Sequence, residues 1–169
     1  MKRMRHMYGI ELAIPDGKLP GFYAQVIHKI GDHVNVFDRD KLLFIVENEA
    51  EKDKLEAILQ KSQMLGDGFS LLLLPPEAMV GHLDDIGFVS PNDHMFVYAD
   101  QVALFTVDKA SGTPADRWAA AEQWKEHVSG TIPQAEEEET IYLLDSSLTE
   151  LVEGIAKAYQ VQVQWLHKT

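Results

Sequence analysis

Cysteine is absent from this sequence of 169 residues. Its absence excludes disulfide bonds, a thiolate nucleophile, iron–sulfur clusters and cysteine-based zinc sites. Long apolar segments are absent too: the run FSLLLLPP, at residues 69–76, is far shorter than the roughly 18 residues of a membrane-spanning helix. The basic start MKRMRH is followed by a segment that Glu11 interrupts, which makes a poor signal-peptide core. We therefore expect a soluble, cytoplasmic protein without a targeting segment.

Sequence motifs that would name a reaction are also missing. The chain contains neither of the glycine-rich phosphate-binding patterns, G-x-x-x-x-G-K-[ST] and G-x-G-x-x-G, and it lacks the G-x-S-x-G nucleophile motif. Serine, histidine and aspartate are all present, but a chain of this length contains them whatever its function, so they do not indicate a catalytic triad. The sequence therefore predicts no cofactor and favours a non-enzymatic protein over an enzyme.

Positive charge is scarce relative to negative charge. The chain holds 15 Lys and Arg against 27 Asp and Glu, a formal net charge of −12. Residues 1–50 are balanced, whereas residues 51–100 and 101–169 carry −6 each. Such a surface repels polyanions, so direct binding to nucleic acid or to an anionic membrane is disfavoured. The imbalance favours a basic protein as partner, as in an immunity-type inhibitor that neutralises its target; the alternative is that the charge serves solubility alone.

The first half of the chain has the pattern strand, helix, strand, strand, helix, strand. The elements are expected at MYGIELAI (residues 7–14), PGFYAQVIHKI (20–30), a hairpin over 33–46 with DRD as its turn, a helix after the N-cap Asn48, and FSLLLL (69–74). This is the order of the ferredoxin-like βαββαβ arrangement. We therefore predict a ferredoxin-like half over residues 1–74.

The second half, residues 75–169, also alternates helices and strands. Its elements are expected to be a short helix over PPEAMVGHLDDIG (75–87) with Met79 on its apolar stripe, strands at HMFVYA (94–99) and QVALFTV (101–107), a helix capped by Thr113 with Pro114 at its first position, a strand at TIYLLD (140–145), a helix with a Ser147–Glu150 capping box, and a strand at VQVQWLH (161–167). The fold class is thus α+β, with mostly antiparallel or mixed sheet and amphipathic helices. The two halves show no residue-level repeat, and one continuous domain over residues 7–169 is the alternative.

Two acidic segments are the candidates for partner binding. The stretch QAEEEET, residues 134–140, places four glutamates in a row, and a second acidic pair lies nearer the middle of the chain. A dense acidic surface speeds encounter with a basic protein, although such a run is also typical of a solvated loop. The candidate partner-binding residues are Glu136, Glu137, Glu138, Glu139, Asp84 and Asp85.

A metal-binding or metal-dependent enzymatic site is the alternative function. The stretch GHLDDIGFVSPNDH gathers imidazoles and carboxylates, which are the ligands that zinc, iron and manganese use. Its spacing matches no known metal signature, and PND is equally typical of a turn. The candidate metal ligands are His82, Asp85, Asp93 and His94.

Self-association is a third hypothesis. The apolar strand FSLLLL and the terminal strand VQVQWLH would each be able to pair with a second copy if they lay at a sheet edge. The sequence therefore leaves open a homodimer.

Overall fold

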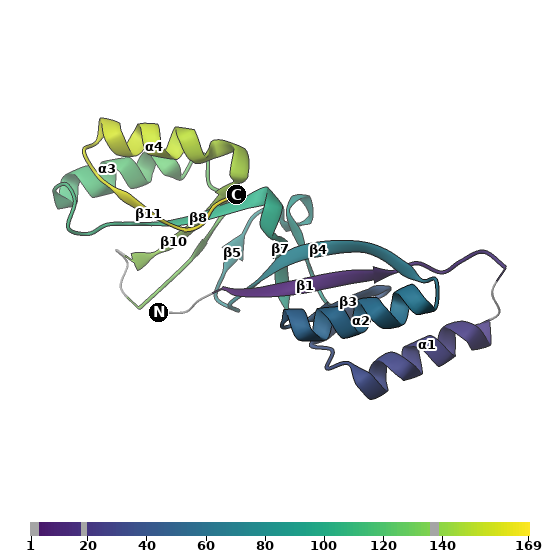
Figure 1. Cartoon of the computed structure of the whole chain (residues 1–169). Helices are drawn as coiled ribbons and strands as arrows, with labels where there is room; N and C mark the ends of the chain where they lie inside the picture. Colours follow the sequence, from purple (N-terminus) through teal and green to yellow (C-terminus); the bar gives the residue numbers. More distant parts are fainter. Residues whose placement is uncertain (1–3, 18–19, 136–138) are drawn as a thin grey trace. The chain divides into compact units, whose positions relative to one another are not determined.

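The computed structural model describes residues 4–17, 20–135 and 139–169, and it divides into two compact units (Figure 1). The N-terminal unit consists of residues 5–73 and 89–96, and the C-terminal unit of residues 74–88 and 97–169 together with Met4. Each unit has its own sheet and its own pair of helices. The chain therefore leaves the N-terminal unit after residue 73 and returns to it for eight residues.

The N-terminal unit is built on a four-stranded antiparallel sheet. Its elements are β1 (Arg5–Leu12), α1 (Pro20–His33), β2 (Asp38–Asp40), β3 (Leu43–Val46), α2 (Glu49–Lys61) and β4 (Leu65–Leu74). The strands follow the order β2-β3-β1-β4, and each of these three pairings is antiparallel. The strands β7 (Met95–Tyr98) and β6 (Gly87–Val89) extend the order beyond β4, so β4 is an interior strand.

The helix α2 shows how this sequence fixes an element. Asn48 is extended, and its side chain accepts a hydrogen bond from the backbone N–H of Glu51 at 2.9 Å, which satisfies one of the free donors at the helix start. Leu55, Ile58 and Leu59 then fall on one face and are buried against β1 and α1. The capping residue and the spacing of the apolar residues both favour a helix that begins after Asn48, and the observed helix begins there.

The predicted hairpin over residues 33–46 is wrong in its details. The helix α1 continues to His33, and DRD forms the strand β2 rather than the turn. The turn lies at residues 41 and 42, where Lys41 adopts a left-handed φ of 54°. Val34, which the apolar pattern assigned to a strand, is instead buried in the core just after the end of α1.

The C-terminal unit repeats the same element order in a second sheet. Its elements are β8 (Val102–Val107), α3 (Pro114–Trp124), β9 (Gly130–Ile132), β10 (Ile141–Asp145), α4 (Thr149–Ala158) and β11 (Val163–His167). The strands follow the order β11-β8-β10-β9, again with antiparallel pairings, and the two-residue strand β5 (Met79–Val80) adds to β9. A Cβ at Gly130 would lie 2.5 Å from the carbonyl oxygen of Met79, so this pairing requires glycine.

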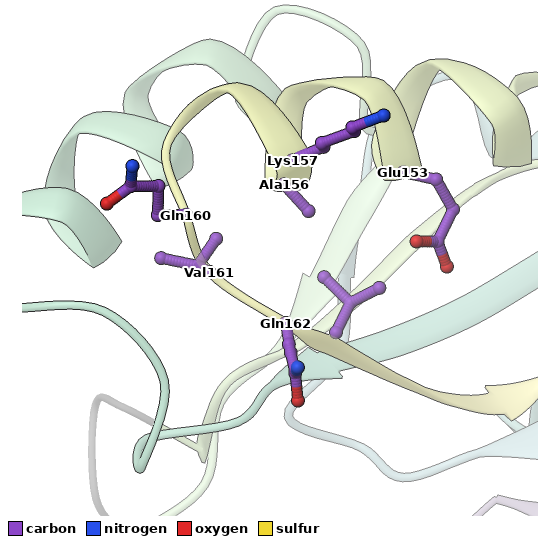
Figure 2. Close-up of a pocket in the computed structure, with 7 residues that line it drawn as sticks. Glu153, Ala156, Lys157, Gln160, Val161 and Gln162 are labelled. Atoms are coloured by element: carbon purple, nitrogen blue, oxygen red, sulfur yellow. The ribbon is translucent and has the colours of Figure 1, made fainter.

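The core of the C-terminal unit lies between its sheet and the helices α3 and α4 (Figure 1). Thr113 caps α3 as predicted, Pro114 follows it in the first turn, and Asp116 completes a reciprocal capping box. The fully buried Trp124 packs edge-on against Phe105, with ring centroids 5.1 Å apart. Beside this core, the end of α4 and the start of β11 enclose an open groove (Figure 2).

Two helix predictions in the second half need correction. Residues 77–86 do not form an α-helix but contain β5 and the short 3-10 helix η1 (Leu83–Asp85); Met79, expected on an apolar helix stripe, is 63% exposed. Ser147 does not cap α4, because a 3-10 turn (Ser146–Leu148) precedes that helix and Asp145 caps the turn instead.

The predicted α+β class with antiparallel sheet is confirmed. Within the described residues, no helix combines the length and the apolar content needed to cross a bilayer.

Candidate functional site

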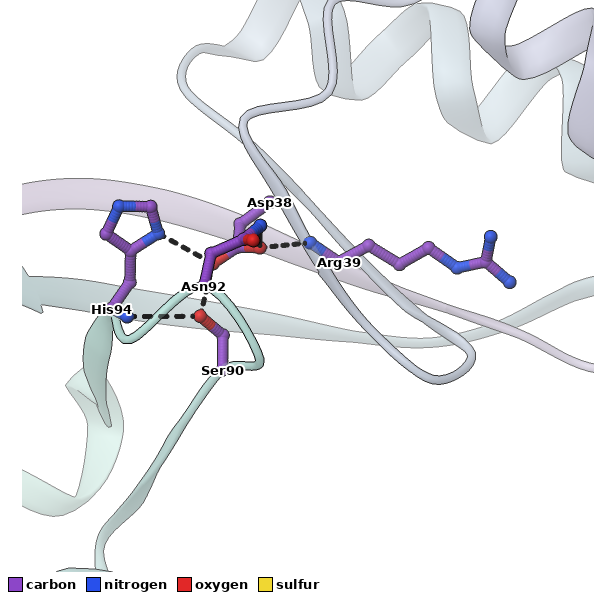
Figure 3. Close-up of polar contacts among 5 residues, drawn as sticks. All are labelled: Asp38, Arg39, Ser90, Asn92 and His94. Carbon is purple, nitrogen blue, oxygen red and sulfur yellow. Dashed lines mark hydrogen bonds and ion pairs between the residues drawn. The ribbon is translucent and has the colours of Figure 1, made fainter.

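A buried carboxylate, Asp38, organises the polar cluster of the N-terminal unit (Figure 3). Asp38 begins β2, and its side chain is 0% exposed. Its two oxygens accept four hydrogen bonds: from the Ser90 hydroxyl, from Asn92 Nδ2 at 2.8 Å, from His94 Nδ1 at 2.7 Å, and from the backbone N–H of Arg39 at 2.7 Å. Burial of a carboxylate is unfavourable unless its lone pairs are satisfied, and here they are.

The donors reach Asp38 because residues 90–94 form a tight turn. The backbone N–H of Ser90 donates to the His94 carbonyl oxygen at 2.9 Å, and the N–H of Asp93 donates to the Ser90 carbonyl oxygen at 2.9 Å. Asp93 adopts a left-handed φ of 63°, a conformation that aspartate tolerates better than most residues. The turn thus presents three donor side chains to a residue more than 50 positions earlier in the chain.

Hydrogen bonding sets the charge state of Asp38. Burial alone would raise its pKa, but the hydrogen bonds from Ser90, His94, the Arg39 N–H and Asn92 together outweigh burial and hold the pKa below the ordinary value of 3.8. Asp38 is therefore a carboxylate at neutral pH and can only accept. It follows that His94 Nδ1 carries the hydrogen of that bond.

The hydrogen bonds to Asp38 hold the 90–94 turn and the His94 imidazole in one orientation. Ser90 donates its hydroxyl hydrogen to Asp38 rather than to a base, which is the opposite of an activated serine nucleophile. The His94 ring packs against Phe37 with centroids 4.9 Å apart, and its side chain is 37% exposed. The arrangement anchors the 90–94 turn to β2.

The structure separates the candidate metal ligands. His82 and Asp85 lie at η1 in the C-terminal unit, whereas Asp93 and His94 lie in the turn of the N-terminal unit. Among the residues that the structure describes, no three His, Asp or Glu side chains form a group able to hold a metal. His94 Nδ1 is already engaged by Asp38. Metal binding stays a prediction from the sequence, without a ligand cluster in support.

The candidate partner-binding acids lie in or beside the C-terminal unit. Asp84 and Asp85 are exposed in η1, and neither makes an ion pair within the described part of the chain. Glu139 pairs with Lys109 at 3.0 Å. Glu136, Glu137 and Glu138 lie outside the described residues.

Negative charge is concentrated in one of the two units. Residues 74–88 and 97–169 hold five Lys and Arg against fifteen Asp and Glu, a net charge of −10. Residues 5–73 and 89–96 hold eight against twelve, a net charge of −4. Residues 74–88 and 97–169 therefore carry more of the chain's negative charge than residues 5–73 and 89–96 do.

An exposed tryptophan accompanies this charge. Trp118 on α3 is 67% exposed and borders a cavity of about 290 Å³. The lining residues are Val107, Pro114, Arg117, Trp118, Ala121, Glu122, Lys125 and Tyr142. Burial raises the pKa of the Tyr142 hydroxyl, and Lys125 pairs with Glu122 at 2.7 Å. An exposed aromatic side chain beside a cavity is a common anchor in protein interfaces.

Comparisons of the chain with protein-family models, with curated proteins and with solved structures find no match. Function therefore has to be argued from the residues described above.

Sequence reasoning missed Asp38, Ser90 and Asn92 as one cluster. The stretch SPNDH does carry a turn signal, which identifies the local conformation of residues 90–94. The sequence contains no signal that this turn meets DRD, because the contact depends on the strand order of the sheet.

Proposed function

We propose that this protein is a non-catalytic binding module that neutralises or regulates a basic protein partner, as an immunity-type inhibitor does, in the cytoplasm. The observation that carries the proposal is the net charge of −10 over residues 74–88 and 97–169. An acidic surface accelerates encounter with a basic protein and repels nucleic acid and anionic membranes. The partner class is thus a protein with a basic face.

We further propose that the contact includes Asp84, Asp85 and the run Glu136–Glu139, with Trp118 as its apolar anchor. The exposure of Asp84 and Asp85 and their lack of ion pairs among the described residues support this assignment. Charges without an internal partner contribute most to steering, because no neighbouring cation offsets their field. A buried aromatic anchor would then slow dissociation, which charge at an interface rim does little to change.

For the fold, we propose that each unit has the ferredoxin-like arrangement and that the chain forms two domains. Supporting this, both units have the order strand, helix, strand, strand, helix, strand, and in both the fourth strand pairs with the first and the first with the third. The arrangement by itself does not indicate a function.

The test is salt-dependent binding by matched charge variants. Tagged full-length protein would be used to capture partners from the native host's lysate at low salt, and binding of the purified partner would be measured by calorimetry. One variant changes Glu136, Glu137, Glu138 and Glu139 to Gln. The control neutralises four exposed acids of the N-terminal unit: Asp16, Glu49, Asp53 and Asp67.

We expect affinity to fall roughly tenfold or more in the four-glutamine variant and by far less in the control. Binding of the unchanged protein should weaken strongly between low salt and about 0.5 M salt, where the Debye length is only a few ångströms. Binding that is insensitive to salt would refute the proposal, and equal losses in both variants would refute the assignment to the C-terminal unit.

A further inference from the structure

The last strand, β11, lies at the edge of its sheet. It pairs with β8 along one side, and among the described residues the sheet order places no strand on its other side. The backbone N–H of Asp108 donates to the carbonyl oxygen of Gln162 at 2.8 Å, so Gln162 faces β8. Because backbone groups alternate along an antiparallel strand, Gln164 also faces β8, and the N–H and C=O groups of Val163 and Trp165 point outward.

The first part of this edge lacks the charge and the proline by which proteins often block further pairing. Edge strands are commonly protected by charged side chains or proline. Residues 158–166, AYQVQVQWL, contain neither. The strand β2, at one end of the other sheet, carries the charged side chains of Arg39 and Asp40, whereas the side chain of Asp38 is buried. A chain with a net charge of −12 repels its own copy, so a neutral edge is where self-pairing meets the least repulsion.

We propose that β11 pairs antiparallel with β11 of a second copy, about a two-fold axis at Gln164. In this register Val163 lies opposite Trp165 of the second copy, and Trp165 lies opposite its Val163. The outward backbone groups of these residues then form two reciprocal pairs with four hydrogen bonds. The proposal goes beyond the binding of a basic protein.

A groove lies beside β11 (Figure 2). It has a volume of about 460 Å³ and lies between the end of α4 and the start of β11. Ala156, Val161 and Val163 form its apolar part, while Glu153 and Lys157 lie on the helix side. Val163 and Trp165 both face the helices.

The second copy's Trp165 would therefore come to lie against Val163 at this groove. Aromatic and β-branched side chains are a favourable cross-strand pair. The symmetric arrangement supplies two such pairs, one at each groove. A second copy thus fits both the backbone edge and the cavity beside it.

The bulge between Trp165 and His167 limits the paired segment. It ends the regular edge after Trp165, so the contact is short. We therefore expect a concentration-dependent dimer rather than a permanent one.

Sedimentation equilibrium of the full chain tests the proposal. We expect the average mass to rise with concentration from 19.1 kDa toward twice that value. Gln164→Lys places two like charges face to face at the axis, so the dimer dissociation constant should rise roughly tenfold or more. This substitution lowers the net negative charge, so general repulsion cannot explain the loss. Gln162→Lys is the matched control, because it introduces the same charge opposite Leu166 of the second copy.

A mixing experiment tests the proposed register. Gln164→Glu alone should also dimerise poorly, whereas an equimolar mixture of Gln164→Lys and Gln164→Glu should regain dimer, because opposite charges then meet at the axis. Circular dichroism would establish that each variant is folded. A mass that stays at 19.1 kDa at all concentrations overturns the proposal. Equal losses in Gln162→Lys and Gln164→Lys, or no recovery on mixing, overturn the β11 register.

Discussion

The two units of this protein share one element order but differ in which strand each leaves at the sheet edge. In the N-terminal unit the second strand, β2, is the edge, and the fourth strand, β4, continues into β7. In the C-terminal unit the second strand, β9, pairs with β5, and the fourth strand, β11, is the edge. The strands β5, β6 and β7 all come from residues 79–98, which connect the elements β1 to β4 with the elements β8 to β11. This connecting segment therefore determines which edges remain open.

The two units also differ in the charge of these outer strands. The outer strand β2 of the less acidic N-terminal unit contains charged residues, whereas the outer strand β11 of the strongly acidic C-terminal unit contains no Asp, Glu, Lys or Arg. Equivalent topology thus supports different surface chemistry, and function has to be sought in the surface rather than in the arrangement of elements.

The largest expected effects come from removing matched core leucines. Leu59 and Leu143 are each 0% exposed, one in each unit, and Leu→Ala at such positions typically costs about 2 to 5 kcal/mol. All three tryptophans lie in the C-terminal unit, so their fluorescence reports on that unit alone. If the units unfold separately, Leu59→Ala should lower the urea midpoint seen by circular dichroism and leave the fluorescence midpoint unchanged.

Leu143→Ala provides the reciprocal control, because it should shift the fluorescence midpoint. A single transition that moves equally in both variants and with both probes would show that the units unfold together, contrary to the proposed division into two domains.

The next largest effect is expected at Asp38. Asp38→Ala leaves the donors of Ser90, Asn92 and His94 without their acceptor, and we expect a loss of about 3 kcal/mol of stability in the N-terminal unit. Urea unfolding followed by circular dichroism measures this loss. Leu65→Ala, which truncates a 40% exposed side chain of the same unit, is the control and should cost far less.

Asp38 also predicts a pH dependence. Because its pKa in the folded protein is lowered, its stabilisation is complete above the unfolded value of about 3.8 and is lost as the pH falls through the folded value. Urea midpoints at pH 5 and pH 3 should therefore differ more in the unchanged protein than in Asp38→Asn. Equal differences would mean that other carboxylates account for the acid sensitivity.

The smallest effects compare a helix cap in each unit. Asn48→Ala in the N-terminal unit and Thr113→Ala in the C-terminal unit each remove a side-chain acceptor at a helix start, and each should cost about 1 kcal/mol. Thermal unfolding measures both losses. Thr113→Ser keeps the hydroxyl and should retain most of the stability; an equal loss in the serine variant would show that the methyl group, not the cap, matters.

Local signals in the sequence located several elements. Asn48 and Thr113 mark the starts of α2 and α3, and the alternation of VQVQWLH marks β11 together with its face toward the helices. Each of these features depends on residues within one turn or a few positions, which is the range over which sequence patterns act.

The errors arose where tertiary pairing decided the outcome. DRD has the composition of a turn, but it becomes β2 because it pairs with β3. Met79 has an apolar helix pattern, but it pairs with Thr131 of β9. The Asp38 cluster was missed for the same reason, since its members are brought together by the sheet. The candidate acids follow from composition alone, and their role in binding remains a proposal.

The return of residues 89–96 to the N-terminal unit has a consequence for the order of events during synthesis. A ribosome releases the chain from its N-terminus, so β1 to β4 emerge first and carry Asp38 with them. The donors from Ser90, Asn92 and His94 emerge only after fifteen further residues that belong to the other unit. The nascent N-terminal unit therefore lacks three of the four hydrogen bonds to Asp38 until the chain has grown past residue 94, and these contacts form while the C-terminal unit is already being made.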